Sequence, residues 1–341
     1  MSEDSERILD RVAARLAQDA HDWRGYYCPR HEAANYGRRF QVAYSAYAVF
    51  AAARRDPARH AHAGVLVRCA LHRLATWPVW GYWRAGHPLA EHNAQYAGHL
   101  LAVWSCAGVL GSGPETLTLT GPHGEVCYTI TPQWLAHNLV RQMRASPCGG
   151  VGCEPGFVYP TCMGAIGWGL ALYDRWTGET LYQETARWRA FLVRRLVVRG
   201  PLPPGVVRCA YSVRHDLAAP VTLAITDAWS LFHLAAESPP LAARLAARLR
   251  ARLRGGRLAA LPGVDRLELG GTGLATAFAA AVAHELGWSE ASPLLAQLGR
   301  WAALPAERRP PPWPWIEALY ALALVLPPGG LAAVFGPSKG G

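Results

Sequence analysis

Apolar residues recur every three or four positions along most of this 341-residue chain. Near its start, Ile8, Val12 and Leu16 form such a stripe after an acidic segment. This spacing places the apolar side chains on one face of a helix. The same pattern predicts further helices near residues 40–55, 61–77, 92–110, 132–145, 163–176, 183–198, 223–236, 239–254, 272–286, 291–303 and 313–326. Prolines and glycines separate these segments, so the chain is expected to form about a dozen helices in succession.

One segment departs from the helical pattern. Between residues 115 and 131, two runs of residues alternate between polar and apolar around Gly121-Pro122-His123-Gly124. Alternation around a turn is typical of a β-hairpin. We therefore predict a small β-hairpin insertion near residues 115–131.

These elements predict an all-α fold, because about a dozen helices pair most simply into two concentric rings, an (α/α)6 barrel. No long hydrophilic linker divides the chain, so residues 1–326 are expected to form one barrel domain and residues 327–341 a flexible C-terminal tail. In such a barrel, the loops at one end form the pocket. The loops Tyr82–His92 and Cys153–Cys162 each precede a helix and are expected at that end.

Composition agrees with a large buried core and argues against a nucleic-acid partner. Hydrophobic residues make up 51% of the chain and charged residues 17%, which is too apolar for a disordered protein. The net charge is +10, but Lys339 is the only lysine and the arginines are spread over many predicted helices. Only the stretch from Arg244 to Arg257 forms a basic patch. We therefore expect no nucleic-acid partner.

The N-terminal segment is acidic and polar, unlike a signal peptide. No apolar run reaches the roughly 18 residues that a membrane-spanning helix needs. We expect a cytoplasmic protein with no membrane partner, whose eight cysteines are reduced. Cys69, Cys106 and Cys209 lie in apolar surroundings and are expected to be small buried hydrophobic residues.

The most informative segment runs from Gly149 to Gly164, where Cys153 and Cys162 flank Glu154 in a glycine- and proline-rich loop. Paired zinc thiolates usually lie two to four residues apart, and a thioredoxin-type site needs Cys-x-x-Cys. This spacing fits neither, and the histidines elsewhere lack ligand-like spacing, so we predict no metal site. Two thiols that face one pocket, and transfer protons there, are the alternative to two cysteines buried in a packed loop. A helix that begins just beyond Cys162 is expected to favour the thiolate form of that residue.

Three segments carry a resemblance to a known family. The cysteine segment resembles the Cys-Glu-Pro…Phe…Cys stretch of the linalool dehydratase/isomerase family, whose two cysteines have the same separation. Residues 91–101 are similar to the family's run that ends in an active-site histidine, here His99. Residues 39–44 resemble its Arg-Tyr-Gln helix. The order and approximate spacing of the three segments also fit.

The resemblance implies an (α/α)6 barrel and a lyase or isomerase that uses no cofactor. It implies that Cys153, Cys162 and His99 are catalytic residues that use acid–base chemistry. Gln95 and Tyr96 are expected to share a helix face with His99, because they precede it by four and three residues. The expected substrate-binding residues are Phe40, Tyr36, Gln95, Tyr96, Tyr159, Glu154 and Trp83. Family members form rings, so a homo-oligomer is one option.

The sequence also departs from the family. Phe40 stands where the family has a tyrosine, Ala34 falls at an acidic position, and Met163 replaces an asparagine. Glu32, Asn35 or Tyr36 compensates only if the loop is shifted. Without this hydroxyl and this carboxylate, the site lacks the groups that help a tertiary alcohol to react. We therefore expect the substrate to be a specialised metabolite other than linalool.

The aromatic residues around the three segments suit a hydrophobic substrate of isoprenoid or polyene type. We therefore predict dehydration, double-bond isomerisation or cyclisation of such a molecule. Two alternatives stay open at this stage. One is a carbohydrate-active (α/α)6 enzyme, which needs a pair of carboxylates in one cleft. The other is a barrel that binds an apolar ligand without transforming it. We also expect Asp227 to cap a helix rather than take part in catalysis.

Overall fold

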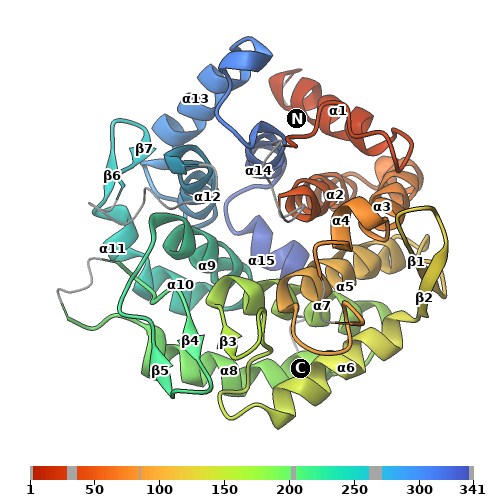
Figure 1. The fold of residues 1–341 in the computed structure, drawn as a ribbon. Coiled ribbons are helices and arrows are strands. Elements are labelled where there is room, and N and C mark those ends of the chain that lie inside the picture. Colours follow the sequence, from red (N-terminus) through yellow and green to blue (C-terminus); the bar gives the residue numbers. More distant parts are fainter. Residues whose placement is uncertain (1–2, 29–36, 84–85, 201–204, 261–270, 338–341) are drawn as a thin grey trace.

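The computed structural model describes residues 3–28, 37–83, 86–200, 205–260 and 271–337, and its helices form two concentric rings (Figure 1). The inner ring consists of α2 (Arg38–Arg55), α5 (Ala94–Val109), α7 (Pro160–Thr177), α9 (Ala224–Glu237), α12 (Gly271–Glu285) and α14 (Trp313–Val325). Each of these helices packs on the next, and α14 packs on α2 to close the ring. The expected (α/α)6 barrel is therefore confirmed.

The outer ring alternates with the inner one along the chain. Its helices are α1 (Glu3–Leu16), α3 (His60–Leu74), α6 (Pro132–Ala145), α8 (Thr185–Phe191), α10 (Pro239–Leu245) and α13 (Ala291–Ala302). Outer helices such as α1 bury one face, whereas α2 and α14 are buried almost all round. This difference follows from composition, because a helix that is apolar on every side must be enclosed by others. Since each inner helix follows an outer one, all six begin at the same end of the barrel.

Short elements fill the connections. The helices are α4 (Trp77–Trp80), α11 (Ala247–Arg250) and α15 (Gly330–Phe335), and α8 continues as a π-helical turn at Leu192–Leu196. Single 3₁₀ turns lie at Pro57–Arg59, Leu181–Glu184 and Ala306–Arg308. The predicted helix over 239–254 is divided into α10 and α11. It ends early, because the strands β6 (Leu253–Arg254) and β7 (Arg257–Leu258) pair across two glycines with positive φ.

The predicted hairpin is present. Strands β1 (Leu117–Thr120) and β2 (Val126–Ile130) pair antiparallel, with Leu117 opposite Ile130. A second small sheet joins β3 (Phe157–Val158), β4 (Tyr211–Ser212) and β5 (Leu217–Ala218). This sheet was not predicted, because its strands have only two residues each. It connects the cysteine segment to the loop that precedes α9.

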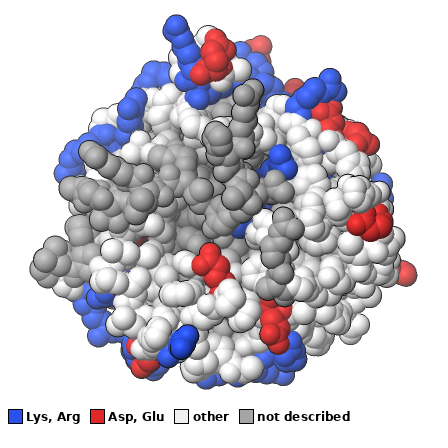
Figure 2. All heavy atoms as spheres, viewed as in Figure 1, with Lys and Arg blue, Asp and Glu red and all other residues white. Residues whose placement is uncertain are grey.

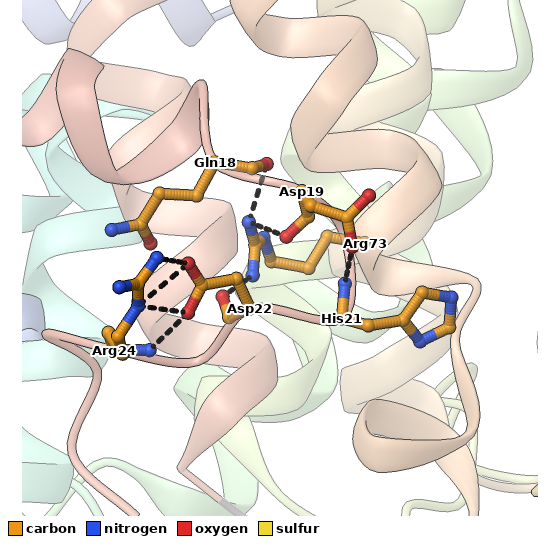
Figure 3. Close-up of polar contacts among 6 residues, drawn as sticks. All are labelled: Gln18, Asp19, His21, Asp22, Arg24 and Arg73. Carbon is orange, nitrogen blue, oxygen red and sulfur yellow. Dashed lines mark hydrogen bonds and ion pairs between the residues drawn. The ribbon is translucent and has the colours of Figure 1, made fainter.

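Buried charges fasten the outer ring to the inner one. Glu317 of α14 is fully buried and pairs with Arg11 at 2.7 Å and Arg15 at 2.5 Å, both from α1. Arg73 of α3 is also fully buried, and its guanidinium donates hydrogen bonds to the carbonyls of Gln18 and Asp19 at 2.9 and 2.8 Å (Figure 3). These bonds hold the loop that follows α1 against α3.

The surface carries its positive charge in scattered form. Figure 2 shows arginine side chains distributed around the rim of the face drawn, with acidic side chains among them. Within the described part of the chain, no helix is both long and apolar enough to cross a membrane.

The expectation of a flexible tail is wrong for residues 330–335. These residues form α15, which lies at the centre of the barrel in Figure 1. Phe335 is fully buried and stacks on Trp168 at 4.3 Å between ring centroids. Glu285 accepts hydrogen bonds from the first turn of α15, and Arg175 donates to the carbonyls of Val334 and Gly336. The segment looks like a tail in sequence because it is short and flanked by proline and glycine.

We predict that Phe335→Ala lowers the free energy of unfolding by about 3–5 kcal/mol, because a large aromatic side chain is removed from a closed core. Urea unfolding monitored by circular dichroism measures the change. Phe157→Ala is the matched control, since Phe157 is 41% exposed and its loss is expected to change stability by less than about 0.5 kcal/mol. Equal small effects of both substitutions would contradict the docking of α15.

Candidate active site

The site depends on a close approach between α5 and α7. A Cβ atom at Gly98 of α5 would lie 2.7 Å from the backbone nitrogen of Ile166 in α7. One at Gly169 of α7 would lie 3.1 Å from the carbonyl of Gly98. Only glycine leaves room for two backbones at this separation. The contact brings the first turns of both helices together at one end of the barrel.

The loops that precede α5 and α7 are hydrogen-bonded to each other. The backbone N–H of Asn93 donates to the carbonyl of Cys153 at 3.2 Å, and that of Ala94 donates to Gly152 at 3.1 Å. His92 and Asn93 both have a positive φ, of 57° and 56°. Two consecutive non-glycine residues in this region store strain, which is common at functional sites. The expected meeting of the two loops is therefore confirmed.

A pocket of about 220 Å³ opens where these loops meet the barrel interior. Its lining combines polar residues, among them both cysteines, with apolar residues that include two indole rings. The lining residues are Gln95, Cys153, Glu154, Tyr159, Thr161, Cys162, Cys209, Leu223, Ile225, Thr226, Trp229, Leu274 and Trp315. The pocket therefore suits a molecule with one polar end and an apolar body.

Cys153 and Cys162 interact directly. Cys153 is 8% exposed and Cys162 is 2% exposed. The Cys153 sulfur accepts a hydrogen bond from the Cys162 thiol, which lowers the pKa of Cys153 despite its burial. The Arg39 guanidinium and the backbone N–H of Gln95, in the first turn of α5, lower it further. Stabilising the anion in these ways favours the thiolate.

Cys162 is the partner that keeps its proton. Burial and the nearby Cys153 sulfur raise the pKa of Cys162 well above its ordinary value. Its thiol also lies 3.5 Å from the Oε1 atom of Gln95, which it can use as an acceptor. The expectation that Cys162 is the thiolate is therefore wrong.

His99 lies deeper in the barrel and is not among the residues that line the pocket. Its Nδ1 atom is 2.8 Å from the Tyr47 hydroxyl. Complete burial lowers the pKa of His99 well below its usual value, so the ring is neutral. The Phe40 ring is in edge contact with it, at 5.5 Å. Phe40 itself stacks on Trp315 at 4.5 Å, beneath the pocket wall.

Gln95 and Tyr96 do not share a face. Gln95 lines the pocket, whereas the Tyr96 hydroxyl donates to the carbonyl of Leu74 in the outer helix α3, at 2.9 Å. Consecutive residues of a helix point in directions about 100° apart, so Tyr96 points away from the direction of Gln95. Residues four apart, such as Gln95 and His99, lie closer to one face. Tyr96 therefore joins the two rings. The sequence prediction for its position is wrong.

The other predicted substrate-binding residues divide between the pocket and its surroundings. Tyr159 and Glu154 both line the pocket, and the Tyr159 hydroxyl donates to Glu154 at 3.0 Å. Trp83 lines a separate surface depression with His87 and Trp134. Tyr36 and Ala34 lie outside the described residues.

Several residues at or near the site were not predicted. Arg39 is 1% exposed and acts on both thiols. Its sequence signal is an arginine within an otherwise apolar helix. Cys209 lines the pocket instead of lying in the core. Trp229 and Trp315 form the apolar wall, and periodicity gives only their place on inner helices.

Asp227 accepts hydrogen bonds from Val206 and Val207 at 2.9 and 2.8 Å, so it fixes a loop rather than capping its own helix.

Met163 has a structural role in place of the family's asparagine. Its sulfur accepts a hydrogen bond from the backbone N–H of Val151 at 3.1 Å, which holds the start of the cysteine segment. Among the described residues, no group of three or more histidine, cysteine or acidic side chains is arranged to hold a metal ion.

The fold and this pocket define an (α/α)6 barrel with a thiol pair at the end where the inner helices begin. The sequence model of the linalool dehydratase/isomerase family matches residues 39–300. The chain therefore belongs to the linalool dehydratase/isomerase family.

Solved structures share the fold. An inactive variant of the α-1,6-mannanase GH76A of Salegentibacter sp. HEL1_6, in complex with α-1,6-mannotetrose, is 10% identical with a TM-score of 0.57. That likeness covers 94% of this chain and 99% of the mannanase. Dfg5 from Chaetomium thermophilum, in complex with glucosamine, is 16% identical with a TM-score of 0.51, over 98% of this chain and 93% of Dfg5. At these identities the likeness shows the fold alone.

We predict that Cys162→Ala raises the pH at which Cys153 becomes reactive by about one unit, because the thiolate loses a hydrogen-bond donor. The measurement is the rate of iodoacetamide modification against pH, followed by mass spectrometry of the Cys153 peptide. Cys209→Ala removes another thiol from the same pocket and serves as the control, with no shift expected. An unchanged midpoint in Cys162→Ala would show that the two sulfurs do not interact.

Proposed function

We propose that this chain is a lyase or isomerase in which Cys153 accepts and Cys162 donates a proton on a hydrophobic substrate. The observation that carries the proposal is that both cysteines line one pocket. The opposite directions of their pKa shifts favour Cys153 as the base and Cys162 as the acid. Membership of the linalool dehydratase/isomerase family supports the same class of reaction.

The pair balances the protons of such a reaction without a cofactor. In isomerisation, the Cys162 thiol protonates one carbon of a double bond while the Cys153 thiolate removes a proton from another. In dehydration, the Cys162 proton goes to the hydroxyl that leaves as water, and Cys153 again takes a proton from carbon. The proton on Cys153 then returns to Cys162 through their hydrogen bond. Each cycle ends as it began.

The apolar wall suits the charge that develops during these steps. Trp229 and Trp315 line the pocket. Indole faces stabilise a developing carbocation, and a dry pocket prevents its capture by water. Cyclisation of a polyene needs the same conditions, so it belongs to the proposed set of reactions.

A polar group on the substrate has a specific partner. The Nε2 atom of Gln95 is buried and has no hydrogen-bond partner among the described residues, while its Oε1 atom lies near Cys162. A buried donor of this kind favours a ligand oxygen that accepts its proton. The proposed substrate is therefore an isoprenoid or polyene with a carbonyl, phenol or similar polar group.

A carbohydrate-active function receives less support. Glycoside hydrolysis uses two carboxylates about 5–9.5 Å apart. Glu154 is the only carboxylate among the described residues that line the pocket. The likeness to the mannanase is a likeness of fold, and folds of this kind host unrelated chemistries.

We expect Cys153→Ala and Cys162→Ala each to reduce kcat by about 10²–10⁴, because each removes a group that transfers a proton. Steady-state rates on a substrate that the wild type converts give the result. Cys148→Ala is the matched control, since Cys148 is buried outside the pocket and its loss leaves the proton path intact. Normal rates in both pocket variants would show that the two thiols are structural residues.

Linalool itself is expected to be a poor substrate. Phe40 has no hydroxyl to assist the departure of a tertiary alcohol, and it is packed beneath Trp229 and Trp315. We expect turnover of linalool to be at least about tenfold slower than turnover of a polyene with a conjugated carbonyl, since only linalool has to lose a tertiary hydroxyl group, and Phe40 has no hydroxyl to assist that step. Gas chromatography of paired incubations makes the comparison. Equal or faster conversion of linalool would refute this substrate class.

A further inference from the structure

A second concave site lies where α1 ends and α14 begins. It is a groove of about 730 Å³, which is within the size range of small-molecule sites. Its walls are the C-terminal half of α1, the turn over residues 24–27 and the segment 306–314. No residue that lines this groove also lines the pocket with the thiols. The groove is therefore a separate candidate site.

Hydrogen bonds to buried groups hold the turn that forms one wall. The backbone N–H of Tyr27 donates to the Oε1 atom of Gln41 at 2.8 Å, and the Nε2 atom of Gln41 donates to the Tyr27 carbonyl at 2.9 Å. Gln41 is fully buried in α2. The Tyr26 hydroxyl donates to the carbonyl of Arg15 at 3.2 Å. The wall is thus formed without a ligand, so that binding costs little ordering.

The arginines of two walls outnumber their acidic partners. Arg11 and Arg15 of α1 share the single carboxylate of Glu317, at 2.7 and 2.5 Å. Arg24 pairs with Asp22 at 2.6 Å (Figure 3). These three guanidinium groups therefore face two carboxylates.

Arg309, on the third wall, is the arginine of the groove that has no ion pair in the described part of the chain. Its Nε atom donates to the carbonyl of Leu304 at 2.9 Å, and its guanidinium lies over the Trp313 ring at 5.6 Å. These contacts fix the cation and leave its two Nη atoms available. The Trp313 indole N–H is also buried without an acceptor among the described residues. The only acidic side chain in the lining is Glu307, which is exposed, so a net positive charge remains.

We infer that this groove binds an organic monocarboxylate with a flat apolar body. A guanidinium matches a carboxylate in a two-pronged pair, and Arg309 has both Nη atoms free for one. Tyr27, Trp313 and the prolines of the third wall give flat apolar surfaces for the body of the ligand. The small excess of positive charge suits one negative charge better than the two of a phosphate ester. This inference does not depend on the reaction proposed for the thiols.

The test is isothermal titration calorimetry with naphthoate, and with naphthamide as its neutral analogue. Naphthoate is expected to bind at least about tenfold more tightly than naphthamide, because only the carboxylate forms charge-assisted hydrogen bonds. Arg309→Met is expected to weaken naphthoate binding by about tenfold or more for the same reason. Arg309→Lys keeps the charge but loses the fork, so an intermediate affinity is expected. Arg308→Met is the matched control, since Arg308 is exposed and does not line the groove.

Equal naphthoate affinity in the wild type and folded Arg309→Met would overturn the inference, because the ligand would then bind elsewhere, the thiol pocket included. Absence of binding to the wild type, or equal affinity for naphthamide, would also overturn it. Tighter binding of naphthyl phosphate than of naphthoate would refute the assignment to a monocarboxylate. If Arg309→Met does not fold, Tyr27→Ala replaces it, because Tyr27 is 38% exposed and forms part of the wall. Naphthoate binding is then expected to weaken by about threefold, and an unchanged affinity would overturn the inference.

Discussion

The contact between α5 and α7 is the constraint on which the site depends. Gly98 and Gly169 let the two backbones approach more closely than any side chain would allow. As a result, the first turn of α5 supplies an N–H group to Cys153, while Cys162 projects from the first turn of α7. Two thiols nine residues apart then line the same pocket. Separating these helices by the width of a methyl group would disturb the position of both.

The two cysteines differ because their surroundings differ, not because their chemistry does. Cys153 has Arg39, the α5 N-terminus and the Cys162 thiol around it, and all three favour an anion. Cys162 is more deeply buried and gives its proton to that anion, so its own ionisation is disfavoured. Environment assigns separate roles to identical side chains in the same way as in carboxylate pairs. The assignment is a property of the pair and is lost if either sulfur is removed.

The shared fold and the distinct site have different origins. The closed ring of inner helices buries apolar faces, and this requirement is satisfied equally well in proteins that act on sugars. The pocket of this chain has two indoles, a thiol pair and one described carboxylate. This lining lacks a second carboxylate among the described residues. The barrel therefore supplies rigidity, and the loops at one end supply the chemistry.

The sequence by itself determined the helices, the hairpin, the barrel and the meeting of the two loops, because apolar periodicity and turn residues act locally. It also identified Cys153 and Cys162, since their loop carries a specific pattern. It did not determine which side chains face the pocket. Tyr96 turns to α3 although it lies next to Gln95, and His99 lies below Phe40 rather than in the lining.

Tertiary structure decided the features that arise between distant segments. The docking of α15 depends on Trp168, and the pocket position of Cys209 depends on the small sheet that β3 forms with β4 and β5. Arg39 is more than one hundred positions from either cysteine, and only the closed ring brings its charge to them. Electrostatic effects depend on distance in space and on burial, which no local pattern encodes. For this reason the sequence predicted the two thiols, and the fold decided that their pKa values shift in opposite directions.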